Sequence, residues 1–295
     1  MKKILNFGSL NADYVYTTDH IVRGGETTSS TGMEIFPGGK GLNQTIALAR
    51  AGLAVHHAGL IGDDGAFLLD TLKADGVDTR FVGRIEGRGG HTIIQVDKNA
   101  QNAILLFGGS NRAVTAEYAD EVLSHFSAGD LLLLQNEISA VPHIIDRAFE
   151  KGMEIWLNPS PMDEGVFECD LTKVSGFFLN EIEGAELTGS DDPETILNLM
   201  VEKFPRAAVV LTLGENGAWY AKDGMRVYCP AEKTTAVDTT AAGDTFTGYF
   251  LRGMLDGLSP AAALQLAAKA SAVTVSRSGA SPSIPKYEEL CTNAE

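Results

Sequence analysis

The segment Asp238-Thr239-Thr240-Ala241-Ala242-Gly243-Asp244 has the residue types and spacing to hold an anion beside a carboxylate. It leads into an amphipathic stretch, and small residues at a helix start leave the first backbone N–H groups open to an anion. The helix macrodipole adds a favourable field. Asp244 would lie on the first turn, close to such an anion, and a carboxylate beside a phosphate site is unfavourable unless it serves the nucleophile or a cation. The alternative is that Asp244 only caps the helix.

A second segment, Pro37-Gly38-Gly39-Lys40-Gly41-Leu42-Asn43-Gln44, leads into another predicted helix. It is not a P-loop, because that motif requires GxxxxGK followed by Ser or Thr, whereas Gly41 follows Lys40. The glycines could let the backbone approach a compact polar ligand, and Asn43 offers both a donor and an acceptor. The alternative is an ordinary glycine turn before a helix.

Polar residues also follow three predicted strands at their carboxyl ends, where ligands bind in open α/β sheets. Asn11 and Asp13 alternate along an extended chain after the first strand, so both could face one cleft. The alternative for this pair is a polar turn. Asn180 and Glu183 follow another strand and could hold Mg²⁺ through water. The segment 212–217 follows a third, and its glycines could admit a nucleotide close to the backbone.

Short apolar runs alternate with amphipathic stretches, which predicts an α/β fold of three layers, α/β/α, around a mainly parallel sheet. The stripe Phe246, Phe250 and Met254 predicts core packing on one helix face. The predicted strands are 4–8, 55–61, 131–134, 154–157, 176–179 and 208–212. The predicted helices are 42–51, 66–74, 116–125, 142–151, 194–203, 243–256 and 260–275.

Two segments, at about 14–36 and 90–107, depart from this alternation. They are rich in Thr, Ser, Val and Ile and contain period-2 stretches, so they predict strands without partner helices. We expect a small β-sheet that projects from the α/β body as a lid. No Pro-rich linker divides the chain, and we expect a single domain over 1–295.

Composition limits the partners of the protein. Its 295 residues are 44% hydrophobic and 21% charged, as in soluble globular proteins, and the net charge is −16. Such a surface repels phosphate backbones and anionic membranes, so neither nucleic acid nor a membrane is an expected partner. Three widely spaced cysteines without a CxxC predict neither disulfides nor zinc, and the first apolar run is too short for a signal peptide. We expect a cytoplasmic protein.

Together and in this order, the segments resemble the ribokinase-like sugar kinases, also called the phosphofructokinase-B type, from Gly8 to about Pro285. The motif 238–244 is the most specific mark, and the glycine motif near Gly39 is the second. Within the family the likeness is greatest to the ribose kinases, through 11–13, 39–44, 180–183 and 279–283. The resemblance implies the ribokinase-like fold and ATP-dependent phosphorylation of a sugar hydroxyl, with D-ribose converted to D-ribose 5-phosphate.

The resemblance also implies a role for each matching residue. Asp244 would be the base, and the backbone amides of Ala241, Ala242 and Gly243 would form an anion hole. The sugar site would be lined by Asn11, Asp13, Gly39, Lys40, Gly41, Asn43, Glu137 and Asp244. ATP would be bordered by Asn180, Thr212, Gly214, Glu215, Gly217 and Gly243.

Two cations and a partner subunit are implied in the same way. Asn180 and Glu183 would organise Mg²⁺ through water. A monovalent cation, K⁺, would be surrounded, largely through backbone carbonyls, by Asp238, Thr240, Thr274, Arg277, Gly279 and Ser283. In relatives such lids pair two subunits with each other, and the resemblance therefore implies a homodimer through the lid.

One departure from the family pattern concerns the sugar. The lid contains Gly89-Gly90-His91 where many relatives have a Thr-Gly pair. If His91 faces the sugar, the substrate could differ from ribose, and the alternative is that His91 points to solvent. Other pentoses, nucleosides and ketose-like sugars therefore stay open. A non-catalytic sugar sensor is a further alternative, although such a protein could dispense with Asp244, Gly243 and Asn180.

Overall fold

The computed structural model describes residues 2–99 and 101–291. Residue 100 of the predicted lid segment 90–107 lies outside the described residues, as do residues 1 and 292–295 of the predicted domain. None of the helices within the described ranges is long and apolar enough to cross a membrane. The assignment of 1–295 to a single domain stays a prediction.

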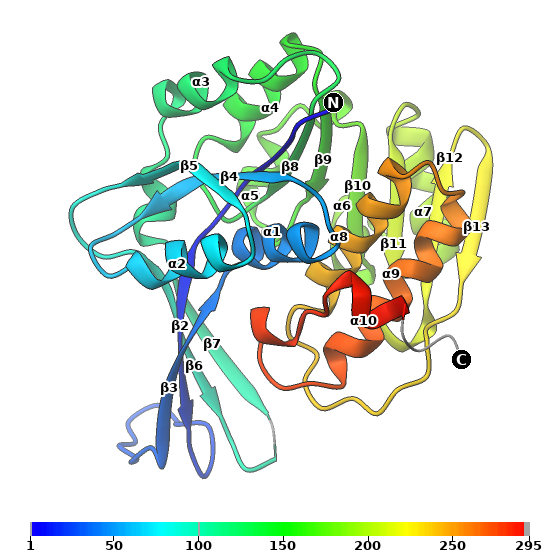
Figure 1. Cartoon of the computed structure of the whole chain (residues 1–295). Helices are drawn as coiled ribbons and strands as arrows, with labels where there is room; N and C mark the ends of the chain where they lie inside the picture. Colours follow the sequence, from blue (N-terminus) through cyan, green and yellow to red (C-terminus); the bar gives the residue numbers. More distant parts are fainter. Residues whose placement is uncertain (1, 100, 292–295) are drawn as a thin grey trace.

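A large mixed sheet forms the body of the molecule (Figure 1). Its order within the described residues is β13-β12-β11-β10-β9-β8-β1-β4-β5. The strands from β11 to β5 in this order are parallel, and β12 and β13 continue antiparallel to β11. The bounds are β1 (Ile4–Phe7), β4 (Val55–Ile61), β5 (Asp78–Arg84), β8 (Leu131–Gln135), β9 (Glu154–Asn158), β10 (Gly176–Asn180), β11 (Ala208–Thr212), β12 (Ala218–Lys222) and β13 (Met225–Cys229).

Helices cover both faces of this sheet. One face packs against α1 (Lys40–Arg50), α2 (Ala66–Ala74), α8 (Ala242–Leu255) and α9 (Pro260–Val275), with α10 (Tyr287–Cys291) beside them. The other packs against α3 (Ala116–Ser124), α4 (Val141–Glu150), α5 (Glu164–Phe167), α6 (Glu181–Thr188) and α7 (Pro193–Lys203). Short 3-10 turns occupy η1 (Gly109–Ala113), η2 (Leu171–Lys173), η3 (Gly214–Asn216) and η4 (Ser281–Ser283).

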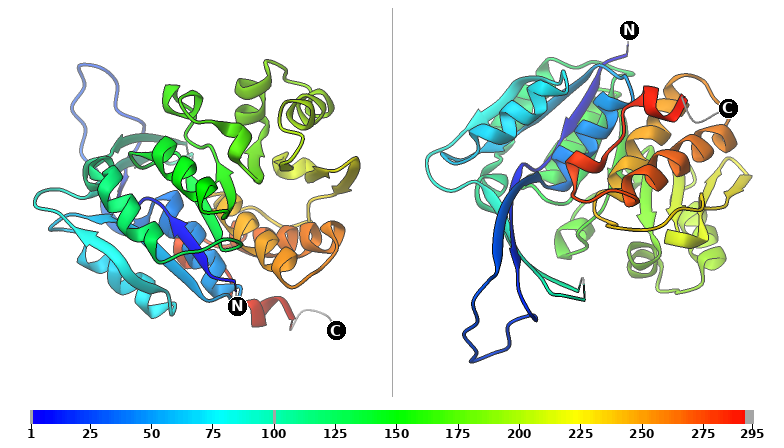
Figure 2. Two further views of the ribbon diagram at one scale, coloured as in Figure 1. Left: turned by 90° about the horizontal axis from the view of Figure 1, so that it is seen from above. Right: turned by 60° about the horizontal axis from the view of Figure 1, so that its bottom comes forward.

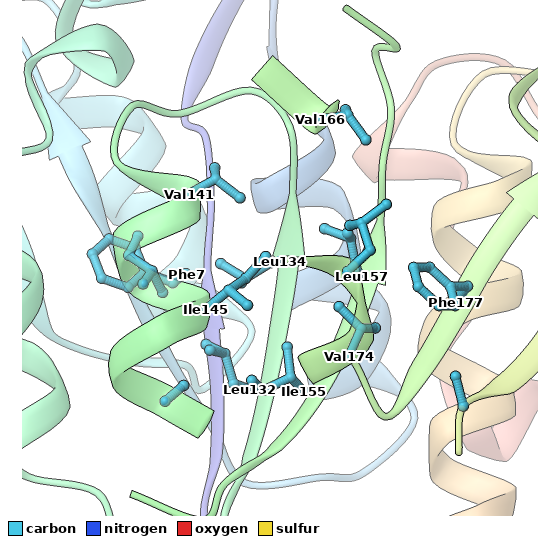
Figure 3. Close-up of a cluster of buried hydrophobic side chains, with 14 of the residues drawn as sticks. Phe7, Leu132, Leu134, Val141, Ile145, Ile155, Leu157, Val166, Val174 and Phe177 are labelled. Atoms are coloured by element: carbon cyan, nitrogen blue, oxygen red, sulfur yellow. The ribbon is translucent and has the colours of Figure 1, made fainter. Parts of the chain in front are cut away.

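The leucines of β8 show why the sheet is covered on both faces. Leu132 and Leu134 pack in one hydrophobic cluster, whereas Leu131 and Leu133 pack in the other. Figure 3 shows Leu132 and Leu134 beside Ile145 of α4 in the first cluster. A strand with apolar residues on both faces is typical of a parallel sheet between helical layers, so the predicted α/β/α fold is confirmed.

A second, four-stranded sheet projects from the body (Figures 1 and 2). Its order is β3-β2-β6-β7, with bounds β2 (Asn11–Thr17), β3 (Gly32–Gly38), β6 (Gly90–Val96) and β7 (Asn102–Phe107). This confirms the predicted small sheet, although β2 begins before and β3 ends after the predicted segment 14–36. Asn11 and Asp13 are therefore part of β2 itself, at the root of the projecting sheet.

The predicted elements agree closely with the structure. Each of the six predicted strands matches to within one residue at either end, and each predicted helix to within two. The elements that the sequence interpretation missed include β5, β12, β13 and α6. The sequence of α6 has no amphipathic stripe, and it begins instead at a capping box between Asn180 and Glu183.

Helices α1 and α8 approach closely enough to bring their starts together. Gly248 of α8 faces α1, and a Cβ at this position would lie 2.5 Å from the Cβ of Ala47 and 2.9 Å from the backbone nitrogen of Leu48. Because backbone cannot move aside as a side-chain tip can, only glycine fits this contact without shifting a helix. The spacing of α1 from α8 therefore depends on Gly248.

The substitution Gly248→Ala should lower the free energy of unfolding by up to about 2 kcal/mol. Overpacking costs about 1–3 kcal/mol, and the higher helix propensity of Ala returns about 1 kcal/mol of it. Urea denaturation checks this, with Gly24→Ala as the matched control, because a Cβ at Gly24 has no neighbour within 4 Å. Equal midpoints for the two variants would contradict the close-approach argument.

Candidate active site

Asp244 lies at the start of α8 and is only 7% exposed. The N-cap position is Ala241, in a left-handed conformation with φ of 62°, and no side chain in the described residues caps the helix there. The Asp244 carboxylate instead turns to α1, where Oδ2 accepts from Asn43 Nδ2 at 3.2 Å and Oδ1 from Gln44 Nε2 at 2.9 Å. The alternative that Asp244 only caps its own helix is therefore wrong.

The amide of Asn43 has a hydrogen-bond partner at its nitrogen but not at its oxygen. Its Nδ2 donates to the Asp244 carboxylate, so its Oδ1 is left as an acceptor. This oxygen is buried and has no hydrogen-bond partner among the described residues. Buried polar atoms are almost always paired, so an orphan beside a carboxylate fits a ligand hydroxyl that would complete it.

Asn11 and Asp13 share one face of β2, as the sequence predicts. Asn11 Oδ1 accepts from Asn111 Nδ2 at 2.7 Å, and Asp13 Oδ1 accepts from Thr92 Oγ1 at 2.5 Å. The glycines opposite make room for these side chains, because a Cβ on Gly38 would lie 1.8 Å from Asp13 Oδ2. Gly39 has φ of +90° and a Cβ there would lie 3.2 Å from Asn11 Cγ. The glycine segment and the β2 root thus form one polar corner.

The orientation of the Asn11 amide follows from its partner. Asn111 Oδ1 accepts from the backbone N–H of Leu10 at 3.1 Å, so Asn111 must present its Nδ2 to Asn11. Asn11 therefore accepts through Oδ1, and its own Nδ2 stays available as a donor. The corner can offer a donor from Asn11 and acceptors from Asp13 and Asn43, the combination that a polyhydroxyl ligand requires.

Lys40 and Glu137 add opposite charges to the corner. The Lys40 backbone N–H donates to Glu137 Oε2 at 2.9 Å, and Ser9 Oγ donates to the same oxygen. Burial lowers the pKa of Lys40, but the carboxylates of Asp244, Glu137 and Glu183 outweigh it, so the net pKa is raised. Burial raises the pKa of Glu137, and Lys40 and Ser9 oppose this shift only in part.

A cavity of about 600 Å³ opens on the other side of the α8 start. Its lining includes five residues predicted to border ATP, namely Thr212, Gly214, Glu215, Gly217 and Gly243. Ala242 also lines it, so backbone at the start of α8 faces this space. Small apolar side chains form a further wall: Ala218, Ala236, Ala268, Ala272 and Val275. A cavity with such apolar walls suits an aromatic base.

Asn180 and Glu183 bind each other in the capping box of α6. Glu183 Oε2 accepts from the Asn180 backbone N–H at 3.0 Å, and Oε1 accepts from Asn180 Nδ2 at 3.1 Å. Burial raises the pKa of Glu183, and the Asn180 N–H opposes the shift. Because both oxygens already accept hydrogen bonds, the pair fits Mg²⁺ through the ion's water shell better than by direct ligation. The described residues contain no cluster of three or more His, Cys, Asp or Glu with metal-binding geometry.

Most of the predicted monovalent-cation residues lie on two loops that are joined through Asp238, whereas Thr274 lies in the last turn of α9. Its Oδ2 accepts from the Gly279 N–H at 2.9 Å, and its Oδ1 from the Thr240 N–H at 2.9 Å. Arg277 donates its backbone N–H to the Thr274 carbonyl at 3.1 Å. Ser283 lies in the next turn of the same loop. Since the Asp238 carboxylate is occupied by donors, the loops fit a cation held mainly by backbone carbonyls.

His91 lies on the opposite face of the small sheet from Asp13. In the register of β2 and β6, Thr92 is opposite Asp13, whereas His91 is opposite Ala12. Side chains alternate between the two faces of a strand, and the Thr92–Asp13 hydrogen bond marks the face toward the glycine segment. The His91 ring contacts Tyr14 and Phe107, with ring centroids 5.9 and 5.0 Å apart. The His91 ring therefore points away from the Asp13 face, and it is half-buried rather than free in solvent.

Several residues of the site were not predicted from the sequence. Gln44 follows Asn43 directly, and its place in the glycine motif was a usable signal. Asn111, Thr92 and Asn158 gave no such signal, because their roles depend on contacts with residues far away in the sequence.

Comparisons with known proteins agree with this site. The family model of pfkB family carbohydrate kinases matches residues 1–287. Ribokinase of Schizosaccharomyces pombe is 36% identical, across 98% of this chain and 97% of that protein. Deoxyribokinase of Salmonella typhi is 30% identical, across 96% and 95%.

Solved structures give the same result. Ribokinase of Cryptococcus neoformans in complex with ADP is 30% identical with a TM-score of 0.85, and covers 99% of both chains. Ribokinase of Arabidopsis thaliana complexed with ribose and ATP is 26% identical with a TM-score of 0.86, across 99% of this chain and 98% of that one. The chain therefore belongs to the pfkB family of carbohydrate kinases, and it is an enzyme of that class.

The raised pKa of Asp13 predicts a pH-dependent stability, which can be used to test the polar corner. That pKa is raised from 3.8 to about 6, because burial and, to a smaller extent, the nearby Glu137 charge outweigh the lowering effect of the Thr92 hydrogen bond. A folded-state pKa above the unfolded value means that Asp13 stabilises the fold at low pH. This contribution is lost as the pH rises from about 4 through about 6.

The substitution Asp13→Asn should therefore increase the free energy of unfolding by about 1–3 kcal/mol at about pH 8. The Thr92 hydrogen bond can persist, because the amide oxygen still accepts. The same variant should raise the KM for the sugar by about 10- to 100-fold, since a charged acceptor is lost. Urea denaturation at two pH values checks the first effect, which should disappear below about pH 4. A stability gain independent of pH would contradict the assignment.

Proposed function

We propose that this carbohydrate kinase transfers the γ-phosphoryl group of ATP to D-ribose and forms D-ribose 5-phosphate. The observation that carries the proposal is the position of Asp244. It lies between a corner of donors and acceptors suited to a sugar and a cavity suited to a nucleotide, at a helix start that attracts anions. The ribokinases among its relatives support ribose as the sugar.

The chemistry follows from that position. Phosphoryl transfer leaves little covalent work to the protein, so catalysis is mainly alignment and charge stabilisation. Asp244 orients the sugar hydroxyl and accepts its proton while the new O–P bond forms. The bond between the γ-phosphorus and the bridging oxygen breaks, and ADP leaves. The backbone N–H of Gly243 stabilises negative charge on the transferred group, whereas the Ala242 N–H donates to the Thr239 carbonyl at 3.3 Å in this structure.

Two cations complete the proposal. Asn180 and Glu183 would hold Mg²⁺ through its waters, and when bound this ion would neutralise phosphate charge. The carbonyls of the two loops joined by Asp238 would hold K⁺, next to the backbone that leads into the start of α8. The donor sets of both places are oxygen-rich, which is the support for these assignments.

The projecting sheet would act as a lid and as a dimer interface. A row of side chains crosses the four strands on the face opposite Asp13. It consists of Ile35, Tyr14, Ile93 and Leu105. Ile35 is 47% exposed, Ile93 39% and Leu105 68%, which is an apolar row that a monomer would leave in water. A second copy of the lid would bury this row. The Asp13 face would close over the sugar and exclude water.

We also infer that the chain works as one domain in the cytoplasm. All three cysteines lie within the described residues and are free thiols, which supports a reducing compartment. The acidic surface supports small molecules, not nucleic acid or membranes, as partners.

A second candidate function is phosphorylation of another sugar, and the deoxyribokinase relative favours deoxyribose as the first to test. Nucleosides and ketose-like sugars belong in the same panel. The non-catalytic sensor has less support, because Asp244, Gly243 and Asn180 are in place.

The substitution Asp244→Asn should lower kcat by about 10²–10⁴-fold, the usual contribution of a general base. An ADP-release assay with Mg²⁺ and K⁺ and a panel of pentoses, hexoses and nucleosides measures it. Preferred turnover of ribose supports the proposed substrate, and preferred turnover of deoxyribose moves the identity to the second candidate. Wild-type turnover by the variant would refute Asp244 as the base.

The substitution Leu105→Lys should convert a dimer into monomers, because it places a charge in the apolar row. Sedimentation velocity measures the mass, and Phe167→Lys is the matched control, since Phe167 is 59% exposed but lies on α5. A monomeric wild-type protein, or dimers that persist in Leu105→Lys, would contradict the proposed interface.

A further inference from the structure

A buried series of amide side chains lies behind Asp244. Gln44, with no exposed surface, donates from Nε2 to Asp244 Oδ1 at 2.9 Å and to Asn158 Oδ1 at 3.1 Å. Its Oε1 accepts from Gln135 Nε2 at 2.6 Å. Gln135 Nε2 also donates to Asn6 Oδ1 at 3.0 Å. Every polar atom of Gln44 is therefore engaged away from solvent.

The hydrogen bonds fix the Gln44 amide in one orientation. Asn158 Nδ2 donates to the Phe178 carbonyl at 3.1 Å, so Asn158 must present Oδ1 to Gln44. A carboxylate also only accepts. Turning the Gln44 amide over would place its oxygen against two acceptors in a dry interior, where unpaired polar atoms cost the most. The Nε2 donor is thus held toward Asp244 by elements other than α1.

The same amides connect Asp244 with the capping box of α6. Asn158 Nδ2 lies 3.4 Å from Glu183 Oε2, and Glu183 forms the capping box with Asn180. Gln44 and Asn158 therefore bridge Asp244 at the start of α8 to Glu183 at the start of α6. A shift of either helix start would strain this bridge.

We propose that Gln44 is a positioning residue for the phosphoryl transfer. It holds Oδ1 of Asp244 while Asn43 holds Oδ2, so that the carboxylate keeps one plane and directs its remaining lone pairs to the sugar hydroxyl. Through Asn158, Gln44 also sets the position of Asp244 relative to the magnesium-binding pair. The inference rests on the proposed function, because it requires Asp244 to be the base.

The test is Gln44→Met, which keeps the length of the side chain and removes the donor. We expect kcat to fall by about 10- to 100-fold, since misplacing a catalytic group by ~1 Å costs about that much. The KM values for sugar and ATP should change by less than about 3-fold, because Gln44 is not placed in contact with either substrate. Gln44→Glu, which keeps the shape and replaces the donor by an oxygen, should lower kcat at least as far.

A double-mutant cycle separates positioning from general stability. In the Asp244→Asn background, Gln44→Met should cost less than about 3-fold in kcat, because its effect acts through Asp244. The matched control is Thr45→Val. Thr45 is the next residue and equally buried, and it bonds Asn6 and His57, so its loss should lower the melting temperature with kcat within about 3-fold of wild type.

The outcomes are distinguishable. Near wild-type kcat in both Gln44 variants, or the same fold loss from Gln44→Met in both backgrounds, would overturn the positioning role while Asp244→Asn still showed its own large loss. If Gln44→Met does not fold, Gln44→Glu decides between these results. Full activity of Asp244→Asn would instead remove the base on which the inference rests.

Discussion

The site depends on two hydrogen bonds that join helix α1 to helix α8. Adjacent amides, Asn43 and Gln44, bind the two oxygens of Asp244, which is about 200 residues away along the chain. These bonds require the two helices to pack backbone to backbone, and Gly248 permits this against Ala47. The start of α1 contributes to the sugar corner and the start of α8 faces the nucleotide cavity. Both substrates can therefore meet at one carboxylate.

Charge is the second constraint on the molecule. The carboxylates of Asp13, Glu137, Glu183 and Asp244 converge near Lys40, in a protein whose net charge is already −16. Burial raises the pKa of the first three, so their ionised forms cost free energy in the folded protein. Hydroxyl donors and cations would favour the ionised forms again. The polar corner thus costs stability in the free protein and is completed by ligands, as is usual at functional sites.

The sequence was sufficient for most of the body but not for the connections inside the site. Apolar runs such as Leu131–Leu134 predicted the buried strands, because burial on both faces leaves no alternation. Helix α6 was missed because its start is a capping box and not an apolar stripe. The motif around Asp244 was recognisable locally. The direction of His91 and the bonds of Gln44 to Asn158 needed the strand register and contacts more than 100 residues apart, which sequence order does not reveal.

The most direct measurement is a crystal structure of the protein with D-ribose, Mg²⁺ and a non-hydrolysable ATP analogue. We expect the 5-hydroxyl of ribose at hydrogen-bond distance, about 2.6–3.2 Å, from an oxygen of Asp244, with the γ-phosphate against the backbone N–H groups at the start of α8. Gln44 should keep its hydrogen bond to the other oxygen of the carboxylate. A sugar whose reacting hydroxyl lay away from Asp244, or a γ-phosphate bound away from α8, would contradict the account.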